Sequence, residues 1–162
     1  MKNLIHDMTG LIHVGSAVIA MVLGTWILII QKGTRFHKRM GYAYAVSMLI
    51  VNGSAFNSYH LFGTFGPFHF TALISLVTLA LGMVPVIRRK PENWLGRHMS
   101  WMYFSVVGLY AAFFSEVLVR VPGTPFAPTV SSASVLTVAA GMWVFFRKRK
   151  MWMSRYSLKS RR

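Results

Sequence analysis

The sequence contains no cysteine and only three acidic residues, which are Asp7, Glu92 and Glu116. Without thiols the chain forms no disulfide, no iron–sulfur cluster and no thiolate metal site. Three acids do not supply the chain of buried carboxylates that a proton-driven transporter uses. The serines have no evident Ser–His–Asp partnership, because Asp7 is the only aspartate. The sequence also lacks a phosphate-binding glycine loop and a nucleotide fingerprint.

Long uncharged stretches dominate what the sequence does contain. Of its 162 residues, 54% are hydrophobic and 13% are charged, whereas a soluble domain carries about 25% charged residues. Several stretches of about 17 to 21 residues lack any charge, which is enough for a helix to cross a bilayer. We therefore predict an all-α membrane protein of a single domain, whose first helix is retained rather than cleaved as a signal. The five expected transmembrane helices cover about residues 8–30, 36–59, 68–87, 97–119 and 129–146.

The positive charge lies on one side of these helices. Sixteen of the 18 lysines and arginines follow the first, third and fifth apolar runs, and only Lys2 and Arg120 lie on the other side. By the positive-inside rule, the N-terminus is outside and the basic tail, residues 147–162, is cytoplasmic. This topology explains the net charge of +15 without nucleic acid. It predicts a multi-pass protein of the bacterial inner membrane whose basic clusters contact anionic lipids.

The first four helices form an internal repeat. One unit covers about residues 8–60 and the other about residues 67–120, and both run in the same direction, as in a parallel repeat about an axis along the membrane normal. Each unit contains, in order, a histidine, a glycine, a basic turn, a second histidine and a tyrosine. These are His13, Gly24, His37 and Tyr42 in the first unit, and His69, Gly82, His98 and Tyr103 in the second. We expect a four-helix bundle with the helix 129–146 at its periphery.

Two segments that begin at the second histidine of each unit resemble a known family. HKRMGYAY and HMSWMYFS resemble the H-R-x-x-G-x-x-Y and H-x-x-W-M-x-x-S/Y patterns of a bacterial integral-membrane family, domain of unknown function 2306. The opening IHVGSAVIAMVLG is similar to the first helix of that family, so the resemblance covers about residues 11–120. Ser105 stands two places after Tyr103, which departs from the second pattern. The resemblance implies a helical membrane fold and supplies no activity.

The four repeated histidines fall at two depths. With about 1.5 Å of rise per residue, His13 lies about 25 Å from the inner end of its helix, and His69 has the same place in the second unit. His37 and His98 begin their helices at the inner face. We call His13 and His69 the outer pair, and His37 and His98 the inner pair. Ionisable residues in spanning segments are costly, so each pair is a candidate functional site.

Two histidine pairs stacked across a membrane are what two haem groups require, because a haem iron can take two axial histidines from facing helices. The architecture looks like that of dihaem b-type membrane cytochromes. That resemblance implies haem b at both pairs and electron transfer across the membrane, with a quinol or another redox partner. Arginine binds carboxylates in a bidentate manner. The residues expected to contact haem propionates or lipid are Arg35, Lys38, Arg39 and Arg97.

Two alternatives remain open. The first is a single outer site for a zinc, copper or iron ion, acting in hydrolysis or metal handling, because three histidines and a carboxylate share this level. Its ligands would be His13, His60, His69 and Glu116. The second is a non-catalytic accessory subunit of a larger membrane complex, and homo-oligomerisation is also open. The residues alone do not decide whether the chain is an enzyme.

Overall fold

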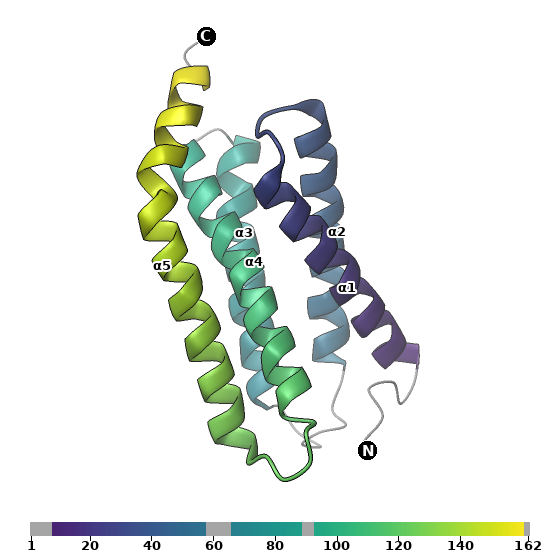
Figure 1. Ribbon diagram of the computed structural model, residues 1–162. Helices are drawn as coiled ribbons and strands as arrows, with labels where there is room; N and C mark the ends of the chain where they lie inside the picture. The colour runs from purple at the N-terminus through teal and green to yellow at the C-terminus, as the bar shows by residue number, and fades with distance from the viewer. Residues whose placement is uncertain (1–7, 58–65, 89–92, 161–162) are drawn as a thin grey trace. The chain divides into compact units, whose positions relative to one another are not determined.

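The computed structural model describes residues 8–57, 66–88 and 93–160, and every regular element among them is an α-helix (Figure 1). The helices are α1 (Met8–Ile29), α2 (Arg35–Phe56), α3 (Pro67–Arg88), α4 (Trp94–Leu118) and α5 (Phe126–Ser160). Contacts divide the chain into two compact units, residues 1–109 and residues 110–162, so the last turns of α4 belong to the unit of α5. The inner pair and the outer pair both belong to the first unit.

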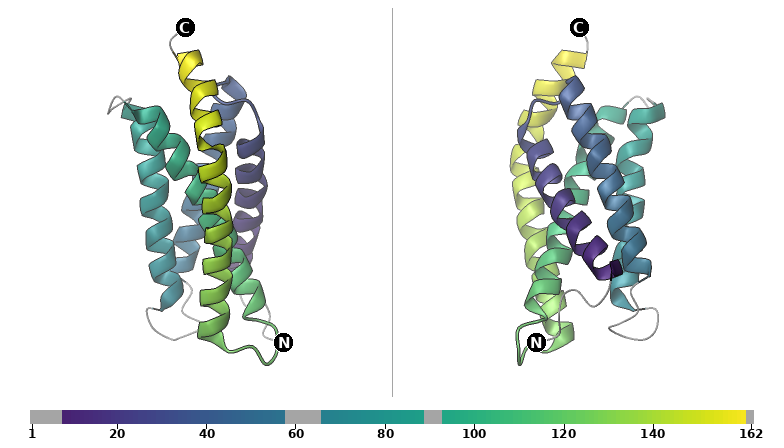
Figure 2. Two further views of the ribbon diagram at one scale, coloured as in Figure 1. Left: turned by 60° about the vertical axis from the view of Figure 1, so that its left-hand side comes forward. Right: turned by 90° about the vertical axis from the view of Figure 1, so that its right-hand side faces the viewer.

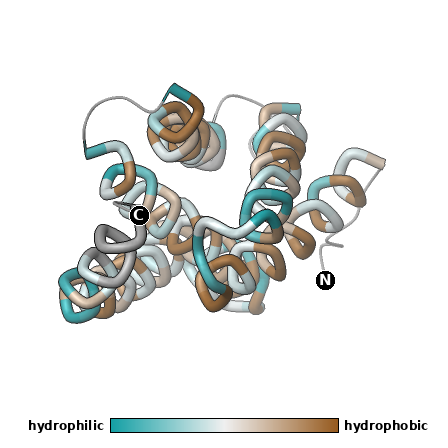
Figure 3. Tube along the Cα trace, turned by 90° about the horizontal axis from the view of Figure 1, so that it is seen from above, coloured by the Kyte–Doolittle hydropathy of each residue, from teal (hydrophilic) through white to brown (hydrophobic). Residues whose placement is uncertain are grey.

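Four of the helices are long and apolar enough to cross a membrane, which confirms the predicted helical membrane protein. These candidate spans are Met8–Ile29, His69–Arg88, Trp94–Leu118 and Phe126–Trp152. Large apolar side chains on them, such as Ile19, Val22 and Ile74, are more than half exposed. Figure 3 shows such hydrophobic residues, in brown, along the helices. Exposed apolar surface on this scale suits contact with lipid.

Within the described residues, α2 is not among the candidate spans, and its sequence combines three basic residues at its start with polar residues further along. Ser47 and Asn52 are buried, whereas apolar residues such as Ile50 are exposed. The Asn52 side chain donates to the Met48 carbonyl at 2.7 Å. The Ser47 hydroxyl donates to the Ala43 carbonyl at 2.9 Å. Because these polar groups are satisfied within the helix, α2 can still cross lipid as part of a bundle, and a fifth span there stays our prediction.

Two glycines let the helices of the first unit approach closely. A Cβ atom on Gly24 of α1 would lie 3.0 Å from Tyr44 of α2 and 3.0 Å from Val106 of α4. A Cβ atom on Gly82 of α3 would lie 2.6 Å from the sulfur of Met102. Small residues at helix crossings are a usual means of packing helices in membranes. Gly24 and Gly82, which hold corresponding places in the sequence repeat, therefore both serve helix packing.

In the first unit, α1 packs antiparallel against α2 and is inclined across it (Figure 2). The contacts between α2 and α4 occur in one register. The rings of His37 and His98 lie next to each other. Seven residues later in each helix, the Tyr44 hydroxyl and the Ser105 hydroxyl are 2.9 Å apart. Because seven residues are about two helical turns, equal offsets mean that the two helices run in the same direction here.

The second unit is a helical hairpin made of the end of α4 and α5. Ser115 is buried in it, and its hydroxyl lies 3.0 Å from the Ser134 hydroxyl and 3.3 Å from the Val130 carbonyl. α5 begins at Phe126, earlier than the expected start at residue 129. The reason is that Pro128 falls in the first turn, where the missing N–H costs no hydrogen bond.

The other end of α5 also differs from the expectation. The helix continues to Ser160, so most of the segment 147–162 that we expected to be a tail is helical. Lysine and arginine are good helix formers, and positive charge near the C-terminus of a helix is favourable. Arg147 lies 4.7 Å from the centroid of the Trp143 ring, within cation–π range. The hydropathy of the sequence falls where the membrane is expected to end, but the helix continues beyond that point.

Candidate functional site

The turn between α1 and α2 fixes the position of His37. Gly33 adopts a φ of +80°, a conformation that glycine tolerates. Thr34 then caps α2, because its side-chain oxygen accepts a hydrogen bond from the backbone N–H of His37 at 3.0 Å. His37 is therefore held in the first turn of α2 by the local chain geometry.

Lys32 closes the end of α1 in the same turn. Its ammonium group donates to the carbonyls of Ile27, Leu28 and Ile30 at 2.7, 2.8 and 2.9 Å. A cation is favourable at the C-terminus of a helix, and burial lowers the pKa of Lys32. Since its three donors are used, Lys32 serves the helix end rather than a ligand. The residues predicted to contact propionates or lipid are all exposed; these are Arg35, Lys38, Arg39 and Arg97.

His98 is held in one orientation by α3. Its Nδ1 lies 2.8 Å from the backbone carbonyl oxygen of Gly82. A carbonyl can only accept, so Nδ1 carries the ring proton and Nε2 keeps its lone pair. Histidines that bind metals donate their other ring N–H in this way, which fixes the ring and makes the ligating nitrogen more basic. The ring of His98 is thus prepared to bind a metal through Nε2.

The structure brings His37 and His98 together. The ring centroids are 6.4 Å apart and the ring planes are 89° to each other. Two rings at this distance would be close enough to hold one metal centre between them. An ordinary edge-to-face pair has a similar separation, so the distance alone does not distinguish a ligand pair from ring packing.

A second observation concerns one ring nitrogen of His37. Its Nδ1 is buried and has no hydrogen-bond partner among the described residues. A buried ring nitrogen without a partner is costly and calls for a bound water, ion or other group. The inner pair therefore combines one ring oriented by a carbonyl with one ring that lacks a partner.

The outer pair has a different environment, and each member contacts α2. His13 Nδ1 lies 2.9 Å from the Ser54 hydroxyl and 3.2 Å from the Val51 carbonyl, so it carries the ring proton. His69 is buried, and its Nδ1 accepts a hydrogen bond from the backbone N–H of Gly66 at 3.0 Å. The ring of His69 also packs against Phe56, with centroids 6.2 Å apart.

The hydrogen bond of His69 has a chemical consequence. Because Nδ1 accepts, the proton of a neutral ring lies on Nε2. A metal at Nε2 would have to displace that proton. His13, whose proton lies on Nδ1, needs no such change. The two histidines that the sequence groups together are therefore prepared differently.

The alternative metal site lies only in part within the described residues. His60 falls outside them, so its place in that site stays a prediction. Glu116 forms an ion pair with Arg120 at 2.7 Å, one turn further along α4. No group of three histidine or acidic side chains that could hold a metal ion occurs in the ranges that the structure describes. The described residues thus offer pairs of ligands rather than a closed set of three or four.

Tyr44 lies near the inner pair and was not among the residues predicted from the sequence. The repeat drew attention to Tyr42 and Tyr103, but Tyr42 is 57% exposed, while Tyr44 is fully buried and bonded to Ser105. The signal was present in the spacing, since Tyr44 follows His37 by seven residues and therefore lies on the same helix face. Tyr44 lies two turns further along α2 than His37 and contacts α4 there.

A comparison with protein families shows which family the chain is related to. A family model described as "Predicted membrane protein (DUF2306)" matches residues 10–147. The chain belongs to this family. Membership confirms the resemblance drawn from the segments at His37 and His98, and the chain is a membrane protein with several candidate spans. The comparisons with curated proteins and with solved structures found no match.

Proposed function

We propose that the chain is a haem-binding membrane protein that transfers electrons, and that His37 and His98 would hold one haem b. The observation that carries the proposal is the geometry of the inner pair. The rings lie 6.4 Å apart, Gly82 holds the proton of His98 on Nδ1, and Nδ1 of His37 is buried without a partner. Two neighbouring imidazoles with these properties would suit a bis-histidine ligand set.

The number of ligands favours haem over a bare ion. A structural zinc site takes four protein ligands and a catalytic one takes three, whereas the described residues hold no such group of three. A porphyrin supplies four nitrogens itself and needs only two histidines. When bound, the haem would supply one-electron redox chemistry. The residues of the chain would orient the imidazoles, and the exposed basic residues Arg35 and Arg97 would bind the propionates.

The outer pair completes the proposal as a second haem site near the opposite face. His13 and His69 each belong to a different unit of the sequence repeat. The proton on Nε2 of His69 must be displaced when this site forms, so we expect weaker binding there than at the inner pair. We further propose that the chain crosses the bacterial inner membrane with the inner pair on the cytoplasmic side, beside the basic turns and the anionic lipids.

An absorption spectrum of the purified, dithionite-reduced protein tests the proposal. The expected result is a Soret band and a b-type alpha band, with one or two haem groups per chain by pyridine haemochrome assay. Potentiometric titration of the same bands then measures the redox potential. A protein that stays colourless after incubation with haemin would overturn the proposal. One equivalent of zinc, copper or iron in a colourless preparation would favour the metal site with His13, His60, His69 and Glu116.

A further inference from the structure

α3 contains a proline in its interior. Pro85 lies three residues after Gly82, and both residues are buried in the first unit. Residues three apart on a helix share a face, so Pro85 lies on the face of α3 that approaches α4. On that face a Cβ atom on Gly82 would meet Met102, and the Gly82 carbonyl oxygen lies 2.8 Å from Nδ1 of His98. The proline is therefore next to the backbone group that orients His98.

A proline inside a helix disturbs the backbone of the preceding turn. It has no N–H, so the carbonyl of Leu81, four residues earlier, loses its usual donor, and the proline ring presses against that carbonyl and bends the helix. In membrane proteins, groups on neighbouring helices supply hydrogen bonds to backbone groups opened in this way. The Gly82 carbonyl follows that of Leu81 directly, and its donor is the ring of His98 on α4. A carbonyl oxygen has two lone pairs, so it can accept from another helix as well as from its own.

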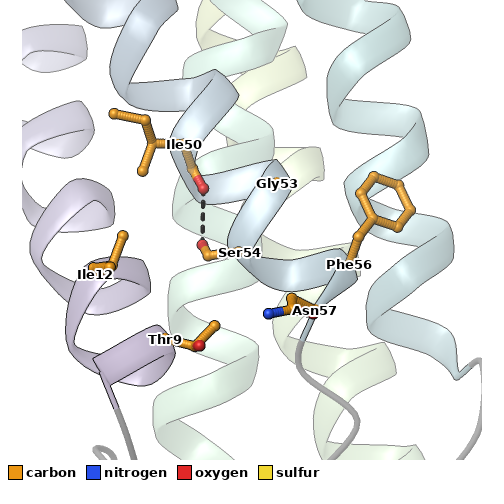
Figure 4. A pocket seen from close by; sticks show the side chains of 7 residues that line it. All are labelled: Thr9, Ile12, Ile50, Gly53, Ser54, Phe56 and Asn57. Carbon is orange, nitrogen blue, oxygen red and sulfur yellow. Dashed lines mark hydrogen bonds between the residues drawn. The ribbon is translucent and has the colours of Figure 1, made fainter.

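Side-chain contacts in α2, which contains no proline, follow a different pattern. The Ser54 hydroxyl donates to the Ile50 carbonyl of the same helix at 2.8 Å (Figure 4). His13 comes from another helix, and its Nδ1 lies 3.2 Å from the Val51 carbonyl and closer, at 2.9 Å, to the Ser54 hydroxyl. The ring of His98, by contrast, approaches a carbonyl to 2.8 Å. The closer approach occurs at the helix that has the proline.

We propose that Pro85 is a positioning residue for His98. By opening the last turns of α3, it directs the Gly82 carbonyl toward α4, and this carbonyl holds the ring proton of His98 on Nδ1. Nε2 then keeps its lone pair for a ligand. The inference concerns the ring before any ligand binds, so it goes beyond the proposed function and does not depend on it.

Pro85→Ala tests the proposal. Alanine restores the N–H and is a better helix former, so α3 is retained and the Leu81 carbonyl regains its donor. The readout is the ring-nitrogen NMR spectrum of the full-length, detergent-solubilised protein labelled with ¹⁵N-histidine, recorded at alkaline pH, where imidazoles are neutral. His98→Gln identifies the signals of His98. We expect a protonated Nδ1 in the wild type, and in Pro85→Ala that protonated fraction should fall by about half, because a ring without this acceptor can take either tautomer.

Two controls belong to this experiment. Pro128→Ala is the matched variant, because Pro128 lies in the first turn of α5, where the missing N–H costs no hydrogen bond. It should leave the His98 signals as in the wild type. His13 is an internal control in the same spectra, since its Nδ1 bonds to the Ser54 hydroxyl of α2 and should stay protonated in both variants. An unchanged His98 tautomer in Pro85→Ala, or an equal change in Pro128→Ala, would overturn the proposal.

A rescue variant separates the backbone effect of the proline from the packing of its ring. In Pro85→Ala/Val86→Pro the proline is moved by one residue, and the carbonyl that loses its helical donor is then that of Gly82 itself. We expect the protonated Nδ1 of His98 to return. If it does not return in a double variant that keeps the wild-type Tm, the backbone carbonyl is not the means by which Pro85 acts, and the proposal is overturned.

Haemin titration of the same samples keeps this test separate from the proposed function. A tautomer that changes as expected in a protein that binds no haem overturns the proposed function alone. Haem binding together with an unchanged tautomer in Pro85→Ala overturns the role of Pro85 alone.

Discussion

The inner and outer ends of the first unit use the same residue type in opposite ways. At the inner end, the proton of His98 is held on Nδ1 by Gly82, and Nδ1 of His37 has no partner among the described residues. At the outer end, the Gly66 N–H donates to His69. The repeat predicted from the sequence relates the positions of these histidines, whereas their hydrogen bonds differ. Ligand competence depends on which nitrogen carries the proton.

Removal of His98 should have the largest effect on this comparison. His98→Ala deletes one axial ligand of the inner pair, and we expect the haem bound at that site to fall at least tenfold. His37→Ala should do the same. Haemin titration of the purified apoprotein measures the affinities, and the tighter phase is assigned to the inner pair. His13→Ala is the control, because it removes a ring from the outer pair and should keep the tighter phase. Loss of the tighter phase in His13→Ala as well would remove the distinction between the two ends.

Gly82→Leu should have the next largest effect. Its Cβ would lie 2.6 Å from the Met102 sulfur and 3.3 Å from the Met102 backbone nitrogen, so α3 and α4 must separate. Overpacking of this kind costs about 1–3 kcal/mol, and it moves the carbonyl that orients His98. Thermal unfolding in detergent should show a lower Tm. Gly15→Leu, at the outer end of α1, meets nothing within 4 Å at Cβ and should keep the wild-type Tm.

Thr34→Ala should have an intermediate effect on the inner end. The substitution removes the cap that accepts from the N–H of His37, and lost caps cost about 1 kcal/mol. We expect a small fall in Tm and a detectably weaker haem affinity by haemin titration. Thr78→Ala is a control without a cap, since Thr78 bonds only within its own helix at the Ile74 carbonyl. If both variants bind haemin equally, the cap does not position His37.

Tyr44→Phe should have the smallest effect. It breaks the buried hydrogen bond with Ser105, and side-chain hydrogen bonds between membrane helices contribute about 0.6 kcal/mol on average. A double-mutant cycle with Ser105→Ala measures the coupling in unfolding titrations. Ser54→Ala removes the corresponding polar contact of His13 at the outer end. A coupling near zero for Tyr44 and Ser105 would mean that the register of α2 and α4 rests on apolar packing alone.

The membrane class and the family were predictable because they depend on composition and on short local motifs. Long uncharged runs predict helices, and the segments at His37 and His98 predicted the family that the comparison confirmed. The bounds of α5 were less predictable. Hydropathy reports the solvent around a helix, whereas its length depends on backbone propensity, which lysine and arginine satisfy as well as leucine does.

The chemistry of the site was predictable only in part. Depth could be counted along the sequence, so it was possible to group His37 with His98 before their rings were located 6.4 Å apart. Which ring nitrogen carries the proton could not be predicted from the sequence, because it depends on carbonyl and amide groups that other helices or turns bring close. Gly82 and Gly66 act through backbone atoms, which every residue type has, so the residue type does not reveal these contacts.

α5 is long enough to carry two labelling positions that are one membrane thickness apart. Ser132 and Ser154 are both small and exposed on this helix, and the 22 steps between them span about 33 Å, close to one hydrocarbon thickness. Because the chain has no cysteine, a single thiol placed at either position is the only one in the molecule. An impermeant maleimide added to intact cells should reach Ser132→Cys first, and Ser154→Cys only after lysis. If the chain crosses the membrane in the opposite direction, Ser154→Cys would be labelled in intact cells and Ser132→Cys only after lysis.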